Sequence, residues 1–339
     1  MLKLIKYLRD YIKETIIGPL FKLFEACFEL IVPLVMASII DKGIKNNDTA
    51  YILKMGGIMI LLGILGLVCS ITAQYFAAKA ALGFGTALRN EMFSHINSLS
   101  FSEIDKIGTA SLITRITSDI NQAQTGVNLV LRLFLRSPFI VAGAIIMALF
   151  INVKLTLIFL AVTLLISLII YFIMSSSIPH YRNVQGKLDK VSLIARENLT
   201  GVRVIRAFSR QKDEVSRFEK STNDLTGTQL MVGKISALLN PATYSILNAG
   251  IIAVMYFGSF TVYEGTISQG ELIALINYMS QILLALLALA NLIIAFTRAS
   301  ASAIRINEVF AVTSTMKENG DDLSKGVKKS PKVEFKNVS

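Results

Sequence analysis

The sequence is poor in the residues that build metal centres, disulfide frameworks and common catalytic sites. It has two cysteines and two histidines among 339 residues. Cys27 and Cys69 both lie inside apolar runs, which favours buried free thiols over a disulfide framework. His95 and His180 are isolated from each other and from any cluster of cysteine or aspartate. The pattern therefore indicates no metal site, and no Ser-His-Asp or Cys-His arrangement is readable.

Charged residues are scarce as well. They make up 17% of the chain, whereas soluble domains carry roughly 25%. Hydrophobic residues make up 53%, and the mean hydropathy is +0.59. Several uninterrupted apolar runs reach the ~20 residues that a helix needs to cross the hydrocarbon core. Because these runs are continuous and not alternating, they exclude a β-barrel and predict an all-α membrane protein.

The apolar runs predict six long transmembrane helices, at approximately 16–40, 55–78, 133–151, 155–178, 242–263 and 270–297. Short loops join the first span to the second, the third to the fourth and the fifth to the sixth. Two long segments, 79–132 and 179–241, make the other connections on the opposite face. The long segments therefore belong to the same side of the membrane as the two termini.

Lysine and arginine gather on that side. Thirty of the 34 lie in residues 1–22, 75–137, 180–240 and 298–339, and the other four are in the short loops. The positive-inside rule then places both termini and both long segments in the cytoplasm of a multi-pass protein of the inner (plasma) membrane. The net charge of +11 follows from this orientation, which argues against a nucleic-acid partner.

Residues 1–15 predict an interfacial amphipathic helix that leads into the first span. Its apolar residues fall on one helical face, and its charged residues fall on the other. Such a helix lies at the membrane surface in contact with lipid. The apolar face holds Leu4, Leu8 and Ile12, and the charged face holds Lys3, Lys6, Asp10 and Lys13.

Both long segments keep helical periodicity. Leu88, Met92 and Ile96 step by four residues before "SFSEIDKIGT" breaks the pattern, and the period then resumes into the third span. The second segment repeats this design around "FSRQKDE" at 208–214. Spans two to five are therefore expected to run unbroken beyond the membrane as two paired stalks, each about 30–37 Å long at 1.5 Å per residue. The function of such stalks is expected at their tips.

This pattern resembles the transmembrane half of an ATP-binding cassette (ABC) exporter. The likeness covers essentially the whole chain and includes "IGTASLITRITSDI" after the first tip and "ENLTGVRVIRAFSRQKDEVSRFEK" around the second. The stretch "LRLFLRSPFIVAGAIIMA" is further similar to bacterial multidrug exporters that assemble as heterodimers. The motif positions are Gly108 or Ala110, Arg115 and Asp119 in the first segment and Glu197, Gly201, Ile205, Arg206, Ala207 and Phe208 in the second.

The resemblance implies a six-helix transmembrane domain over residues 16–310, followed by a linker and the first strand of a nucleotide-binding domain over 311–339. The last residues, "VEFKNVS", look like that strand. No phosphate loop of the form G-x-x-x-x-G-K-[ST] occurs in the sequence, so no cofactor site is expected in this chain. ATP and Mg would bind in the missing domain. Whether the protein is an enzyme is left open, because only the full-length family protein hydrolyses ATP.

The resemblance also gives the two stalk tips a role. Phe101–Lys106 and Phe208–Asp213 would be coupling helices that dock into nucleotide-binding domains, the alternative being two ordinary polar turns. An aromatic anchor with flanking charges suits such docking. The residues implied are Phe101, Glu103, Asp105, Lys106, Phe208, Arg210, Gln211 and Asp213. The remaining expected partner is a second half-transporter, giving a homodimer or heterodimer of 12 spans.

Glu25 and Glu29 lie four residues apart on one face of the first span. Ionisable groups within a span are costly and tend to face a cavity or a partner. Three interpretations stay open: contact with a cationic substrate, an ion pair with Arg132 or Arg136, and hydrated placement near the interface. The two arginines also suit snorkelling to lipid headgroups.

Amide, tyrosine and methionine side chains form stripes on spans five and six. Such stripes suit a binding wall that adapts to several substrates, and hydrogen bonding between helices explains single members equally well. The predicted substrate-binding residues are Glu25, Glu29, Asn128, Arg132, Tyr244, Asn248, Met255, Asn277, Gln281 and Asn291.

The sequence therefore predicts the membrane-spanning half of an ATP-driven exporter. It would move amphipathic drugs, lipids or peptides outward from the inner leaflet or cytoplasm by alternating access. The alternative is an ion-coupled secondary transporter or a lipid flippase. A secondary transporter should show broken helices in matching halves, and these spans read as intact. An intramembrane enzyme would need a catalytic pair, for which Glu25 and Glu29 are the only carboxylates at membrane depth.

Overall fold

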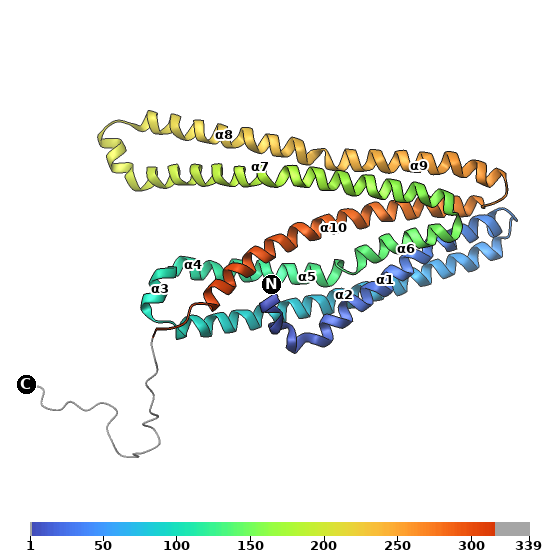
Figure 1. Ribbon diagram of the computed structural model, residues 1–339, viewed down its shortest axis with the longest axis horizontal. Helices are drawn as coiled ribbons and strands as arrows, with labels where there is room; N and C mark the ends of the chain where they lie inside the picture. The colour runs from blue at the N-terminus through green and yellow to red at the C-terminus, as the bar shows by residue number, and fades with distance from the viewer. Residues whose placement is uncertain (1, 316–339) are drawn as a thin grey trace, which may run out of the picture.

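The computed structural model describes residues 2–315, and within them every regular element is helical (Figure 1). The predicted first strand at the end of the sequence lies outside the described residues. In chain order the elements are the 3-10 helix η1 (Leu2–Tyr11), α1 (Ile12–Ser38), the π-helix η2 (Ile39–Ile44), α2 (Thr49–Ser98), α3 (Phe101–Ile107), α4 (Thr109–Thr114), the π-helix η3 (Arg115–Asp119), α5 (Ile120–Leu133), α6 (Arg136–Ile151), α7 (Val153–Ala207), α8 (Gln211–Ala237), α9 (Leu239–Tyr263) and α10 (Gln269–Phe310).

Six helical stretches are long and apolar enough to cross a membrane. Each contains an 18-residue window with a mean hydropathy between 1.6 and 2.9. This confirms the predicted all-α fold with six spanning helices. The stretches are Lys3–Ile44, Thr49–Ser98, Thr109–Ile151, Val153–Ala207, Gln211–Tyr263 and Gln269–Phe310.

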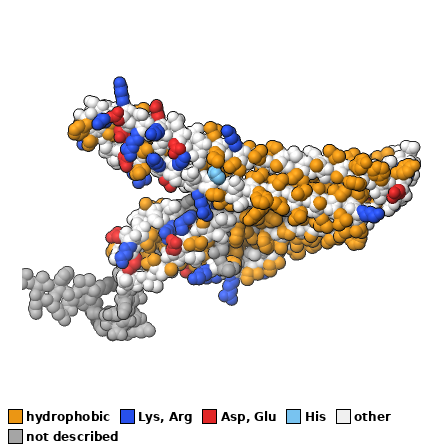
Figure 2. Space-filling model, turned by 45° about the horizontal axis from the view of Figure 1, so that its top comes forward, with side chains coloured by type: hydrophobic (Ala, Val, Ile, Leu, Met, Phe, Trp, Pro, Cys, Tyr) orange, Lys and Arg blue, Asp and Glu red, His pale blue; other side chains and the backbone are white. Residues whose placement is uncertain are grey.

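The helices form one bundle from which two arms project (Figure 1). We call the side with the short connections 45–48 and 264–268 the loop end, and the side with the tips the stalk end. The first arm contains the second half of α2 and α3 to α5, and the second contains the second half of α7 and α8 (Figure 1). Figure 2 shows apolar side chains covering the bundle, while lysine, arginine, aspartate and glutamate gather on the two arms. This division matches a membrane-embedded bundle with polar stalks.

The expectation that spans two to five run unbroken is confirmed for α2 and α7 and is wrong for the other two. A turn at Phe134–Leu135 separates α5 from α6, and a turn at Leu238 separates α8 from α9. A proline lies just after each turn, at Pro138 and Pro241. Proline has no backbone N–H and its ring clashes with the carbonyl four residues earlier, so each one interrupts its helix.

Two hydrophobic cores hold the fold together. The bundle core combines α1, α6, α7, α9 and the first half of α10, with Phe159, Tyr278 and Met279 fully buried. The stalk core combines η1, α2, α5 and the last turns of α10, with Phe84 and Ile306 among its members. α10 thus contributes to both cores, whereas α7 contributes to the bundle core alone, through the half that precedes its arm.

The N-terminal helix η1 packs on protein. Leu4 is 1% exposed and lies in the stalk core with Leu8 packed against it, and the ring of Tyr7 stacks on Phe310 with 6.2 Å between centroids. That this helix lies in the membrane interface stays a prediction, and two residues of its apolar face, Leu4 and Leu8, pack on protein. Ile12, the third residue of that predicted face, is exposed. The helix therefore ties the start of the chain to the end of α10.

A polar clasp closes the loop end between the first and last helices. The Asp41 carboxylate accepts hydrogen bonds from the Ser268 hydroxyl and from the Gly270 backbone N–H at 2.9 Å. Gly270 lies so close to α1 that a Cβ would come within 2.3 Å of the Ala37 carbonyl oxygen. Glycine is required at this crossing because two of the atoms that a Cβ would meet, the carbonyl oxygen and the Cα of Ala37, belong to the α1 backbone and cannot rotate away.

We predict that Gly270→Ala lowers the free energy of unfolding by about 1–3 kcal/mol, because the added methyl group forces the two helices apart. The measurement is unfolding of the purified protein in mixed micelles with rising denaturing detergent. Gly63→Ala is the matched control, since a Cβ there meets nothing within 4 Å. Equal stabilities for the two variants would contradict the close crossing.

Candidate functional site

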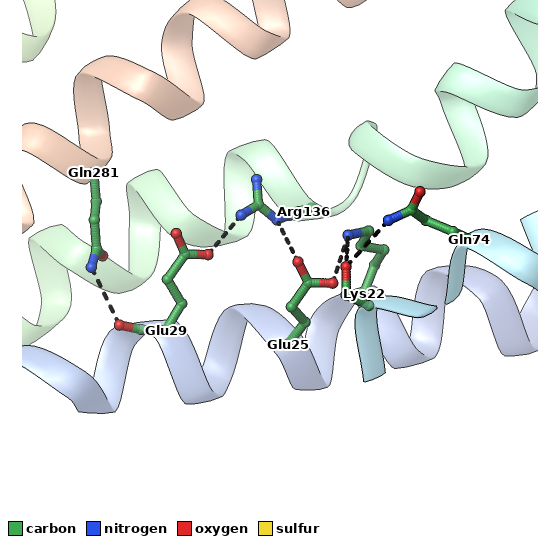
Figure 3. A network of polar contacts seen from close by, with 7 residues as sticks. Lys22, Glu25, Glu29, Gln74, Arg136 and Gln281 are labelled. Atoms are coloured by element: carbon green, nitrogen blue, oxygen red, sulfur yellow. Dashed lines mark hydrogen bonds and ion pairs between the residues drawn. The ribbon is translucent and has the colours of Figure 1, made fainter. Parts of the chain in front are cut away.

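A cluster of four charged side chains lies inside the bundle, between α1 and α6 (Figure 3). Lys22 donates to the Glu25 carboxylate at 2.6 Å. Arg136 donates to the Glu29 carboxylate at 2.7 Å, and its Nε lies 3.9 Å from Glu25. The two acids and two bases cancel in formal charge. Such balance is what makes ionised groups tolerable at membrane depth.

Local chain geometry brings these groups together. Lys22, Glu25 and Glu29 fall on one face of α1 because residues three and four apart are neighbours on a helix. Arg136 is the first residue of α6, just after the turn at Phe134–Leu135, so the helix break positions its guanidinium. Lys22 also contacts the Ser70 hydroxyl of α2 at 3.3 Å, and Gln74 donates to that hydroxyl at 3.4 Å.

α10 closes the cluster from a third side. The Gln281 amide donates to the Glu29 backbone carbonyl at 3.3 Å, and the Tyr278 hydroxyl donates to the Leu30 carbonyl at 2.7 Å. Both acceptors are backbone atoms of α1. A spanning helix has few backbone carbonyls free for such bonds, so α10 is held to α1 at one defined position.

Three interpretations of Glu25 and Glu29 were open. The structure contains one of them, an ion pair of these carboxylates with Arg136. Their side chains are 16% and 37% exposed, so Glu29 remains partly accessible. Contact of Glu29 with a cationic substrate stays a prediction, because an accessible carboxylate can exchange one cation for another.

Several polar atoms of this part of the bundle are buried and find no hydrogen-bond partner among the residues that the structure describes. They are Asn128 Oδ1, Arg132 Nε, Arg136 Nε, Ser137 Oγ and Gln281 Oε1. They belong to α5, α6 and α10, which pack against one another. Buried polar groups are ordinarily hydrogen-bonded, so these atoms mark a region suited to water or a polar ligand group. Asn128, Arg132 and Gln281 were predicted from the sequence to bind substrate.

The other predicted substrate residues do not join the cluster. Tyr244, Asn248 and Met255 are exposed on α9, and Asn277 and Asn291 are exposed on α10. The Asn277 amide donates to the Ile273 carbonyl of its own helix at 3.1 Å. These side chains therefore form open stripes on the bundle.

The first stalk tip is the short helix α3, which matches the predicted tip closely. Phe101 is 86% exposed, and Asp105 and Lys106 are exposed beside it. Glu103 points the other way and is buried. It forms a capping box with Ser100, and its carboxylate accepts from the Thr315 hydroxyl at 2.7 Å. The Ser100 and Thr315 hydroxyls lower the pKa of Glu103 to about 2, so it stays ionised and holds α3 in place.

The second tip is a turn, and it differs from the helix that the resemblance implied. Phe208, Ser209 and Arg210 connect α7 to α8, and Ser209 has a φ of 54°. Phe208 is 74% exposed, and Gln211 begins α8. Arg210 donates to Asp213 at 2.5 Å, with both side chains largely exposed. Both tips thus present an aromatic ring with charged neighbours.

Sequence reasoning missed three residues of this region. Lys22 was counted only as an orientational charge, although its spacing of three from Glu25 signals a pair on one helix face. Tyr278 lacked any sequence signal, since its partner is a backbone carbonyl 248 residues away. Asp41 belongs to η2 at the loop end, but the sequence interpretation assigned it to the short connection after the first span, where an acidic residue carries no distinctive pattern.

The fold and the site together define a multi-pass helical membrane protein with an intramembrane charge cluster and two projecting stalks. The chain belongs to the family of ABC transporter transmembrane regions, whose family model matches residues 15–287. The resemblance inferred from the stalk motifs is therefore confirmed.

Several curated proteins are similar to this chain. An uncharacterized ABC transporter ATP-binding protein of Mycobacterium tuberculosis is 33% identical over 313 residues, which are 92% of this chain and 53% of the relative. One of Bacillus subtilis is 32% identical over 342 residues, 100% of this chain and 59% of the relative. ABC transporter B family member 1 of Dictyostelium discoideum is 24% identical over 256 residues, 74% of this chain and 28% of the relative. The chain thus spans a little over half the length of the first two.

We predict that Arg136→Gln lowers the free energy of unfolding by about 1–3 kcal/mol, because it leaves two carboxylates facing Lys22 alone. The loss should stay below that of a fully buried pair because Glu29 is partly exposed. Adding Glu29→Gln should recover part of it. Arg210→Gln is the control, since its exposed pair with Asp213 should contribute less than about 1 kcal/mol. Unfolding in mixed micelles measures all four proteins, and equal losses for Arg136→Gln and Arg210→Gln would refute a structural role for the cluster.

Proposed function

We propose that this chain is the membrane-spanning half of an ATP-driven exporter for amphipathic substrates. The stalk end would face the cytoplasm, as the distribution of lysine and arginine along the chain predicts. ATP-binding domains would dock there, close on ATP and move the stalks, so that the bundle alternates between inward-facing and outward-facing states. Substrate would be released because its affinity differs between the two states.

The observation that carries this proposal is the pair of stalk tips. Phe101 and Phe208 are largely exposed, although aromatic rings are usually buried in packed surfaces. Each ring has charged neighbours, namely Asp105 and Lys106 at the first tip and Arg210 and Asp213 at the second. An exposed ring with a charged rim fits a groove on another protein.

A second half-transporter, identical or related, is the partner that the second arm supports. α8 packs mainly against α7 and α9, and the arm leaves many apolar side chains in the open. Leu199, Val204, Leu230 and Leu238 are each about 60% exposed or more. Exposed apolar side chains gathered on one arm favour an interface with another chain.

The proposed substrate path runs between the charge cluster and the open stripes. Glu29 offers a partly accessible carboxylate, and Tyr244, Asn248 and Met255 on α9 offer apolar and polar contacts along one helix. A molecule with one polar end and an apolar body matches such a wall. Drugs, lipids and peptides of this kind reach the bundle from the inner leaflet.

We predict that cysteines placed at the tips, at Ser102 and Lys212, crosslink to a separately expressed ATP-binding domain. This ATP-binding domain is taken from the Bacillus subtilis relative described above, because the whole of this chain aligns with 59% of that relative. Cys27 and Cys69 are first replaced by alanine. The expected result is a higher yield with ATP than without it, because ATP closes the domains beneath the stalks.

The control is a cysteine at Thr226, which is exposed on α8 away from the tip. Phe101→Ala and Phe208→Ala should each reduce the yield at their own tip. Tip yields no higher than the Thr226 yield, with folded protein confirmed by its helical circular dichroism, would contradict the docking role.

A further inference from the structure

The motif residues Arg115 and Asp119 have structural partners that the resemblance does not supply. Both lie in η3, a π-helical turn between α4 and α5. Such widened turns are rare, and they often mark functional positions in a helix. Here the turn presents both side chains to α10, which runs beside η3 and α5 along the first arm (Figure 1).

Asp119 and Arg305 form the central pair of this contact. The Arg305 Nε donates to the Asp119 carboxylate at 2.9 Å, and a second guanidinium nitrogen contacts the other carboxylate oxygen. The Asp119 side chain is 5% exposed. Burial by itself raises the pKa of Asp119, but hydrogen bonds from Arg305 and Ser302 hold it below the ordinary value. A bidentate pair on a buried carboxylate fixes both distance and orientation, even though the Arg305 side chain is half exposed.

Arg115 adds a second, crossed pair. It donates to the Arg305 backbone carbonyl at 2.9 Å and lies 3.3 Å from the Glu308 carboxylate. We call Arg115, Asp119, Arg305 and Glu308 the α10 clamp. Each helix contributes one acid and one base, so a shift of α10 by one turn would place like charges together.

The clamp is reinforced toward the tip. The His95 ring, on α2, is 3.0 Å from the Val309 carbonyl oxygen. Beyond the end of α10, Thr315 donates to Glu103 of α3. The first tip, the first arm and the end of α10 are therefore held by a continuous series of polar contacts above the stalk core.

The second arm is built differently. Its polar contacts stay within the arm, such as Arg217 with Glu197 at 2.9 Å and Lys187 with Asp224 at 2.6 Å. α10 meets α7 in the bundle core. Over its last turns α10 is therefore attached to the first arm, and within residues 2–315 these turns share no hydrophobic core with the second arm.

We propose that Asp119 and Arg305, supported by Arg115, are positioning residues that make α10 and the first arm a single lever. A displacement of α3 then moves α10, whose other half holds α1 at Glu29 and Leu30 through Gln281 and Tyr278. The stalk tip and the intramembrane charge cluster are thereby linked by one helix. The idea that α3 receives the force rests on the proposed function. The rigid connection between α10 and the first arm does not depend on it.

The test uses nitroxide labels at Asp105 on α3 and Asn291 on α10, both exposed, in the full chain without Cys27 and Cys69. Pulsed electron resonance then measures the distribution of distances between them in lipid nanodiscs. We expect one narrow distribution for the parent chain. Asp119→Asn and Arg305→Gln should each broaden it, and the double variant should be no broader than either, since both remove the same pair. Arg305→Lys should restore a narrower distribution than Arg305→Gln.

The matched control is Glu197→Gln with Arg217→Gln, which removes an ion pair from the second arm and should leave the width unchanged. Joined to an ATP-binding domain, Asp119→Asn should also lower substrate transported per ATP by roughly fivefold or more, with ATP hydrolysis retained.

A distribution for Asp119→Asn as narrow as that of the parent chain would overturn the lever, whatever the outcome of tip crosslinking. Failure of crosslinking with a normal broadening would instead overturn the docking role and leave the lever standing. A broadening caused by Glu197→Gln with Arg217→Gln would also count against the clamp, because general loosening would then explain the effect.

Discussion

The double burial of α10 is the constraint on which the rest of the structure depends. Its first half lies among the apolar side chains of α1, α6, α7 and α9, and its last turns lie among those of η1, α2 and α5. A helix is stiff along its axis because each turn is hydrogen-bonded to the next. One continuous helix of 42 residues therefore fixes how the bundle and the first arm are placed relative to each other.

Two charged networks set the register of this helix at different depths. In the bundle, Gln281 and Tyr278 bond to the α1 backbone beside the pairs that Arg136 makes with Glu25 and Glu29. In the arm, the half-exposed Arg305 pairs with the buried carboxylate of Asp119. Apolar packing alone tolerates sliding by small steps, whereas a bidentate pair loses its hydrogen bonds when displaced by an ångström or two. The two polar networks thus fix the position of α10 along helices that it otherwise contacts through apolar side chains.

The sequence predicted the six spans, the two arms and the tips, because apolar run length and helical periodicity depend on local residues. It missed the breaks before Pro138 and Pro241, since the apolar pattern continues on both sides of each proline. It left the partner of Glu29 open, because Arg136 is 107 residues away and spacing in sequence says nothing about such pairs. It predicted the apolar face of η1 that holds Leu4 but not that the stalk core covers this residue, because amphipathicity does not show what packs against a helix. The partners of Arg115 and Asp119 lay beyond its reach for the same reason, 186 or more residues along the chain.

Hydrogen exchange of individual backbone amides in nanodiscs tests the double burial of α10 most directly. We expect the backbone amides of residues 303–310 to open together with those of the α5 residues in the stalk core, as one cooperative unit, and separately from those of α7 and α8. Exchange of residues 303–310 at the rate of an unfolded peptide, or in step with α8, would contradict it.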